Sequence, residues 1–293
     1  WSEKWQMKFK CHVMSITHRR NTIGRHSYHR GTDVLSTVEL EDYHLGVTLS
    51  SKLSWKKHIT NVTTKANRML GLIKRNLKHC SPKLKQQAYV SLVRPHLEYC
   101  STVWNPHQQS YINQLEAIQR RSARFVKNLY QRSVDMPYRT ESVTAMLQDM
   151  KWESLQARRE TATKTMMYKI ANGLIAINKA DYLSPLTNQR TRSFHPNKFQ
   201  PLTKPSSKDV FKHSFMPTAV RLWNSLPGDT ISAPTLSVFR TLLAPQSLSG
   251  TLFYSHYCTT CTSFTDTSFF TSAFIQNWTS AEYPHRCRCR CNF

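Results

Sequence analysis

Closely spaced arginines are the residues whose type and position best suit a chemical role in this sequence. Arg120, Arg121 and Arg124 stand close together, and Lys127 follows them. A guanidinium group donates two parallel hydrogen bonds to a phosphate, and residues three apart on a helix share one face. If the segment is helical, the pattern predicts a phosphate-binding face, with an ordinary solvated face as the alternative.

Carboxylates offer no comparable site. A two-metal nucleotidyl-transfer centre needs clustered carboxylates, but the sequence has no Asp-Asp pair, and its acidic cluster is Asp33, Glu39, Glu41 and Asp42. These residues are better explained as a hairpin loop than as metal ligands. Hydrolase and metalloprotease motifs are absent, and the 7 glycines are too far apart for a phosphate-binding loop. No self-contained active site is therefore expected.

The C-terminal segment holds the remaining candidate metal ligands, which are Cys258, Cys261, His285, Cys287, Cys289 and Cys291. Thiolates and imidazoles are the usual ligands of zinc. Their spacing here matches no standard zinc knuckle, and a single C-x-x-C pair is a weak signal. The arginines between them suit a nucleic-acid-binding tail; a poorly ordered end, or translation past the natural terminus, is the alternative. No metal is assigned to this chain.

The charge balance predicts a polyanionic partner. The chain has 293 residues and a formal net charge of +24, from 41 Lys and Arg against 17 Asp and Glu. Such a chain is expected to bind RNA, DNA or an RNA–DNA duplex. No apolar run approaches the roughly 20 residues that span a bilayer, and no membrane partner is expected. The unevenly spaced cysteines favour a reducing compartment, which suits a nuclear and cytoplasmic location.

The N-terminal segment, residues 1–54, is expected to contain strands. Two runs, 34–38 and 43–49, have strand composition, and alternate residues of the second run are apolar, as in a half-buried strand. With the acidic cluster as the loop between them, the two runs predict a β-hairpin.

Residues 55–180 are expected to form a basic helical bundle. Apolar residues at three- and four-residue spacing predict helices near 59–77, 84–93, 111–128 and 152–171. The block carries 22 Lys and Arg against 7 Asp and Glu. A bound polyanion would offset the resulting repulsion, and a solvated basic surface is the alternative.

The second of these helices has the clearest boundary signals. Ser81 and Pro82 mark its start, and Pro95 is expected to end or kink it. The residues expected to face the core are Leu84, Ala88, Leu92 and Val93.

The last two segments differ from the bundle. Residues 181–245 contain eight prolines and are expected to pack as a loop-rich extension with short helices near 215–223 and 236–243. Residues 246–293 are rich in Ser, Thr and Cys and are expected to be disordered. Core packing is expected, rather than base stacking, for Trp55, Trp104, Trp152 and Trp223.

An ordered series of short segments carries a family resemblance. In chain order the segments are 43–47 (YHLGV), 53–55 (LSW), 58–59 (HI), 65–68 (KANR), 81–82 (SP), 92–95 (LVRP), 97–100 (LEYC), 103–104 (VW), 115–125 and 221–227 (RLWNSLP). Three single residues, Gly71, Leu147 and Phe239, belong to the same series. Together they resemble the region that follows the catalytic palm in reverse transcriptases of non-LTR retrotransposons, in the jockey-like, LINE-type group. A set of residues near the N-terminus resembles the end of the palm, namely Trp1, Trp5, Met7, Phe9, Lys10 and Cys11.

The resemblance implies that this chain is the C-terminal part of an RNA-directed DNA polymerase, whose palm, fingers and endonuclease lie upstream. Leu45, Gly46 and Val47 would belong to the primer-grip hairpin, and the helices that follow would be the thumb, which tracks the phosphates of the template–primer duplex. The fold class expected is mainly α: a short N-terminal β-hairpin, a helical thumb-like bundle, a Pro-rich irregular region and a disordered tail.

The charge pattern and the resemblance together predict ten nucleic-acid-binding residues. They are Lys65, Arg68, Lys74, Arg75, Lys78, Arg94, Arg120, Arg121, Arg124 and Lys127.

One departure from the family limits what this chain is expected to do. The aromatic-x-Asp-Asp turn that carries the catalytic aspartates of the family is absent. We therefore expect no polymerisation by this chain alone, and Mg is implied only for the full-length family enzyme. A degraded or domesticated remnant is the alternative, acting as a helical protein-interaction module or having no function.

Overall fold

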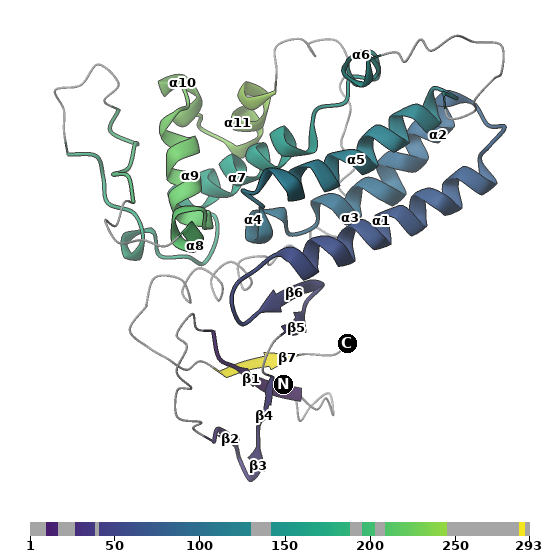
Figure 1. Ribbon diagram of the computed structural model, residues 1–293. Coiled ribbons are helices and arrows are strands. Elements are labelled where there is room, and N and C mark those ends of the chain that lie inside the picture. The colour runs from purple at the N-terminus through teal and green to yellow at the C-terminus, as the bar shows by residue number, and fades with distance from the viewer. Residues whose placement is uncertain are drawn as a thin grey trace, which may run out of the picture. The chain divides into compact units, whose positions relative to one another are not determined.

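A computed structural model describes residues 10–16, 27–38, 41–129, 142–187, 195–202, 209–244 and 287–290 (Figure 1). This part of the chain is mainly helical with short strands near its N-terminus, which confirms the expected fold class. It forms two compact units. Unit 1 lies within Trp1–Leu97, Gln108–Arg139 and Ser280–Phe293, and unit 2 lies within Glu98–His107 and Thr140–Thr279. The four-segment division drawn from composition stays a prediction.

A small sheet in unit 1 joins distant parts of the sequence. Strand β1 (Lys10–Met14) lies between β4 (Ser36–Val38), which runs parallel to it, and β7 (Cys287–Arg290), which runs antiparallel. A separate two-stranded ribbon pairs β2 (His29–Arg30) with β3 (Asp33–Val34). The expected strand 34–38 is therefore split in two. Residues 245–286 and 291–293 of the tail lie outside the described residues.

The hairpin that precedes the helices is displaced from its predicted position. Strand β5 (Glu41–His44) pairs with β6 (Val47–Ser50), so the turn falls at Leu45–Gly46 and not at the acidic cluster. Both turn residues have positive φ, 44° and 85°. A two-residue turn of this kind matches the twist of the strands and favours glycine. The predicted continuous strand 43–49 is wrong for this reason.

Helix α1 (Lys56–Asn76) forms as the apolar spacing predicts. Its buried stripe includes Ile59, Val62, Ala66 and Leu70, residues that recur every three or four positions and so face one side. This stripe packs against β6, against the helical segment near Tyr89 and against α5 (Gln109–Val126). The hairpin strand that packs on α1 is β6, in which Val47, Thr48 and Leu49 are buried.

Ser81 caps α2 (Pro82–Ala88), since its hydroxyl accepts a hydrogen bond from the backbone N–H of Leu84. The helix continues through a π-helical turn, η1 (Tyr89–Val93), into α3 (Arg94–Glu98). Pro95 thus does not end the helix. In the wider turn the backbone N–H of Arg94 donates to the carbonyl of Tyr89, and Pro95, which has no N–H to donate, follows in the first turn of α3.

The buried face of α2 and η1 differs from the predicted one. Leu84 and Leu92 are 45% and 47% exposed, whereas Lys85, Tyr89 and Val93 are buried. The predicted core face is therefore wrong by one position, apart from Val93. Apolar content alone misled the prediction, because a lysine occupies a core position.

Specific contacts with α5 explain how Lys85 is accommodated. Its Nζ donates a hydrogen bond to Oδ1 of Asn128, just beyond the end of α5, and lies 5.0 Å from the centre of the Phe125 ring. The hydroxyl of Tyr89 donates to Oε1 of Gln119 at 3.1 Å, and both residues are buried. A buried polar group is costly unless it is hydrogen-bonded. These contacts fix α2 and η1 against α5.

Unit 2 begins with α4 (Ser101–Trp104), which packs against α7 (Leu155–Ala171). The α7 side chain Arg158 forms a two-pronged ion pair with Glu98, and Nε of Arg159 donates to Oδ1 of Asn105 at 3.1 Å. Bidentate pairing of this kind is strong and geometrically specific. Two neighbouring arginines therefore bind the segment 98–107 to α7.

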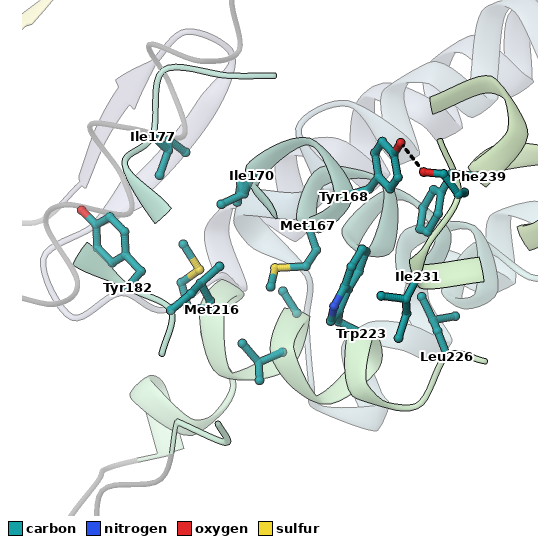
Figure 2. Close-up of a cluster of buried hydrophobic side chains, with 14 residues drawn as sticks. Met167, Tyr168, Ile170, Ile177, Tyr182, Met216, Trp223, Leu226, Ile231 and Phe239 are labelled. Atoms are coloured by element: carbon teal, nitrogen blue, oxygen red, sulfur yellow. Dashed lines mark hydrogen bonds between the residues drawn. The ribbon is translucent and has the colours of Figure 1, made fainter. Parts of the chain in front are cut away.

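The core of unit 2 is aromatic. Tyr168 of α7, Trp223 of α9 (Phe215–Asn224) and Phe239 of α11 (Leu236–Leu243) lie together, and the Tyr168 hydroxyl donates to the carbonyl of Ala233 at 2.8 Å (Figure 2). Met167 lies in the same cluster. Both predicted short helices of the Pro-rich segment are confirmed.

The described part of unit 2 also contains shorter elements. They are α6 (Val143–Asp149), η2 (Lys179–Asp181), α8 (Asp209–Lys212) and α10 (Gly228–Ile231).

Replacing Lys85 tests whether this buried cation stabilises unit 1. Lys85→Ala is expected to lower the free energy of unfolding by about 3 kcal/mol, because it leaves a cavity and removes the contacts of Lys85 with Asn128 and the Phe125 ring. Lys83→Ala is the matched control, since Lys83 is exposed on the same helix; its effect should stay within about 0.5 kcal/mol. Urea unfolding measures both, and equal effects would contradict the assigned role of Lys85.

Candidate nucleic-acid interface

Helix α1 presents a cationic stripe opposite its buried face. Lys65, Arg68 and Arg75 are exposed. At about 100° per residue they fall within an arc of about 80° on the helix surface. The helix contains six Lys and Arg and no Asp or Glu, so no acidic neighbour on α1 offsets their charge.

A second group of cations lies where α1 meets α5. Lys74 is half-buried at the flank of the α1 core stripe. Burial, and then the charge of Arg121 on α5, lower the pKa of Lys74. Within the described residues, neither side chain forms an ion pair with a carboxylate. Two helices that pack through their apolar stripes therefore bring two positive groups together.

The three predicted arginines of α5 share the exposed side of that helix. Arg121 and Arg124 are exposed, and Arg120 is half-buried. Nε of Arg121 donates to the carbonyl of Ala117 at 3.2 Å, and Arg120 donates to the carbonyl of Asn113 at 3.5 Å. Both arginines lean back along the helix, and a guanidinium has further N–H groups with which to bind an anion.

The remaining predicted cations are more dispersed. Lys78 is exposed beyond the end of α1, and Lys127 is half-buried at the C-terminal cap of α5. Arg94 is half-buried on α3. The structure therefore brings Lys74 and Arg121 within electrostatic range of each other, and it places Lys78, Lys127 and Arg94 apart from the exposed cations of α1 and α5.

The predicted primer-grip residues have different environments. Leu45 is 45% exposed at the tip of the β5–β6 turn, beside Gly46, whereas Val47 is fully buried. Val47 therefore serves the core. Tyr43, 43% exposed on β5, lies near α1, with Nζ of Lys65 at 5.5 Å from its ring centre. An exposed aromatic ring beside a cation is a combination that suits a nucleic-acid strand.

His58 attaches the hairpin to α1. The backbone N–H of Thr48 on β6 donates to Nδ1 of His58 at 3.1 Å, and Nδ2 of Asn61 donates to the Thr48 hydroxyl at 3.1 Å. Burial, and then the charge of Lys65, lower the pKa of His58 to about 4. The ring is therefore neutral near pH 7, as an acceptor at Nδ1 requires.

Sequence reasoning placed Tyr43 and His58 in the resembling segments 43–47 and 58–59 but gave neither residue a role at the candidate interface. His58 lies next to buried Ile59 at the start of α1, and this position was the available signal. The contact between Lys65 and Tyr43 depends on the turn at Gly46, which the predicted long strand concealed.

Other sequence candidates are also located. Trp104 and Trp223 are fully buried, which confirms core packing for them, and Trp55 and Trp152 are half-buried. In the described ranges, no three His, Cys, Asp or Glu side chains gather in a way that could hold a metal ion. Cys258, Cys261, His285, Cys291 and Glu39 lie outside those ranges.

Comparison with protein-family models, with curated proteins and with solved structures gave no match. Among the helices that the structure describes, none has the length and apolar composition needed to cross a bilayer.

The His58 contact predicts a specific loss of stability in acid. The unfolded chain takes up this proton near pH 6.5 and the folded chain only near pH 4, so stability falls as the pH drops through that window, by up to about 3 kcal/mol. His58→Gln should reduce the difference between the unfolding free energies measured at pH 7 and pH 4.5.

The matched control is His79→Gln, because His79 is exposed just beyond α1. Denaturant unfolding at both pH values checks the prediction. If the wild type and His58→Gln lose the same stability, His58 does not hold the hairpin in its neutral form.

Proposed function

We propose that this chain is the primer-grip and thumb part of a non-LTR retrotransposon reverse transcriptase, and that it binds template–primer nucleic acid through phosphates without polymerising DNA by itself. The upstream palm, fingers and endonuclease of the parent protein are its partners in this proposal. The phosphate contacts are independent of base sequence and depend strongly on salt.

The observation that carries the proposal is the cationic surface shared by α1 and α5. Lys74 and Arg121 lie close enough for one to lower the pKa of the other, and the described residues provide no carboxylate to neutralise either. Phosphates along a nucleic-acid backbone would relieve this repulsion. Like charges held close across a helix interface destabilise the fold by repulsion, and a bound polyanion offsets this cost.

The hairpin supports the same proposal. The β5–β6 turn is held against the first turns of α1 by the contacts of Thr48 with His58 and Asn61. Exposed Tyr43 is thereby kept beside Lys65, at the end of the α1 cationic stripe. A strand end that follows the stripe would meet an aromatic side chain there.

Neutralising the α5 arginines tests the proposed interface. The Arg120→Gln/Arg121→Gln/Arg124→Gln variant should bind an RNA–DNA hybrid more weakly than the wild type. The slope of log affinity against log salt should also become shallower, by about 0.7 to 0.9 for each phosphate contact that is lost. Fluorescence anisotropy over a range of salt concentrations measures both.

A variant with the same loss of charge elsewhere is the control. Lys151→Gln/Lys164→Gln/Lys179→Gln removes three lysines from unit 2 and should leave the slope near that of the wild type. A slope that changes equally in both variants would assign the binding to net charge alone and would overturn the proposed interface.

The absence of the catalytic aspartates predicts the outcome of a primer-extension assay. This chain, supplied with template, primer, Mg²⁺ and nucleotides, should extend no primer, because phosphoryl transfer needs convergent carboxylates to hold the metal ions. Extension by the purified chain would show that it contains a polymerase centre, contrary to the proposal.

A further inference from the structure

Two histidines from distant parts of unit 2 stack on one another. The rings of His107, which follows α4, and His213, which lies between α8 and α9, have their centres 4.1 Å apart and their planes within 8° of parallel. Both residues are exposed. The first proton on a stacked pair of imidazoles lies beside a neutral ring, whereas a second proton places two cations in contact, so the two protonation steps are coupled.

Charged residues on both neighbouring elements face this pair. Lys212 at the end of α8 and Arg221 on α9 lie near His213, with Asp209 as the acidic member of the group. Burial, then His107, Lys212 and Arg221, lower the pKa of His213, against the opposing effect of Asp209. The surroundings of His213 are therefore net positive, and they disfavour its proton in the absence of an anion.

The N-terminus of α9 adds to this positive character. The helix has ten residues and begins at Phe215, and the side chain of its N-cap residue Ser214 accepts no capping hydrogen bond. The Ser214 hydroxyl instead donates to the carbonyl of Phe211 at 2.7 Å. Uncapped N–H groups at a helix start carry partial positive charge and favour an anion.

We propose that His107, His213, Lys212 and Arg221 form a phosphodiester-binding site on unit 2 whose affinity rises as the pH falls below 7. A phosphate oxyanion at the pair compensates the charge that opposes protonation, so phosphate binding and proton uptake reinforce one another. By linkage, the ligand raises the pKa of the pair and acid strengthens the binding.

This site is separate from the interface proposed for function. It lies wholly in unit 2 and depends on imidazole groups, which as a class titrate near neutral pH, whereas the guanidinium groups of α5 stay charged throughout. The two proposals can therefore fail independently.

The test follows the two histidines in the full chain while a short oligouridylate is added. Phosphodiesters keep one negative charge at neutral and mildly acid pH, so any pH dependence belongs to the protein. In NMR spectra at pH 6.0, the ring C–H resonances assigned with His107→Gln and His213→Gln should move on addition. Binding should be roughly tenfold tighter at pH 6.0 than at pH 7.5.

Variants separate this site from α5. His107→Gln/His213→Gln should keep wild-type affinity at pH 7.5 and lose the gain at pH 6.0, whereas the triple arginine variant should lose affinity at both. Lys212→Gln/Arg221→Gln should raise the titration midpoint of His213 in the free protein. Unmoved resonances at pH 6.0, or a gain that the double histidine variant retains, would overturn the proposal.

Discussion

The packing of two basic helices through their apolar stripes is the constraint on which the arrangement of unit 1 depends. The apolar stripes of α1 and α5 must pack together to form a core, and this packing brings Lys74 and Arg121 close. Lys85 of α2 is also buried. Its ammonium group contacts the amide oxygen of Asn128 and the ring of Phe125, with no carboxylate in those contacts. The unit thus accommodates positive charge through dipoles and leaves its exposed cations to act on the surroundings.

The helical framework could be predicted because apolar periodicity determines it. The buried stripe of α1, the cap at Ser81 and the two short helices of the Pro-rich segment all follow from local spacing. The buried face of α2 could not be predicted in this way, since Lys85 occupies a core position that only its contacts with Asn128 and Phe125 explain. The hairpin was misplaced because its turn contains Leu45, a residue that strand alternation assigns to a strand.

The candidate interface shows the same division between local and distant information. Sequence reasoning found the arginines of α5 because their spacing is local. The pairing of Lys74 with Arg121, and the position of Tyr43 beside Lys65, arise from contacts between elements. His58 and His213 both have lowered pKa values for reasons of burial and neighbouring charge. One is enclosed beneath a hairpin, and the other lies on the surface, so the first serves stability and only the second is accessible to a ligand.

The path of the chain between the two units affects how the protein can form during synthesis. Unit 2 takes the segment Glu98–His107, which starts at the last residue of α3 and ends just before α5, and both of these helices contribute residues to unit 1. No contiguous half of the polypeptide therefore contains either unit whole. As the chain leaves the ribosome, Asn105 emerges 54 residues before Arg159, its hydrogen-bonding partner on α7. The α4 segment therefore has no partner helix until α7 has been synthesised, whereas α1 and α2, on which α5 packs, precede α5 in the chain.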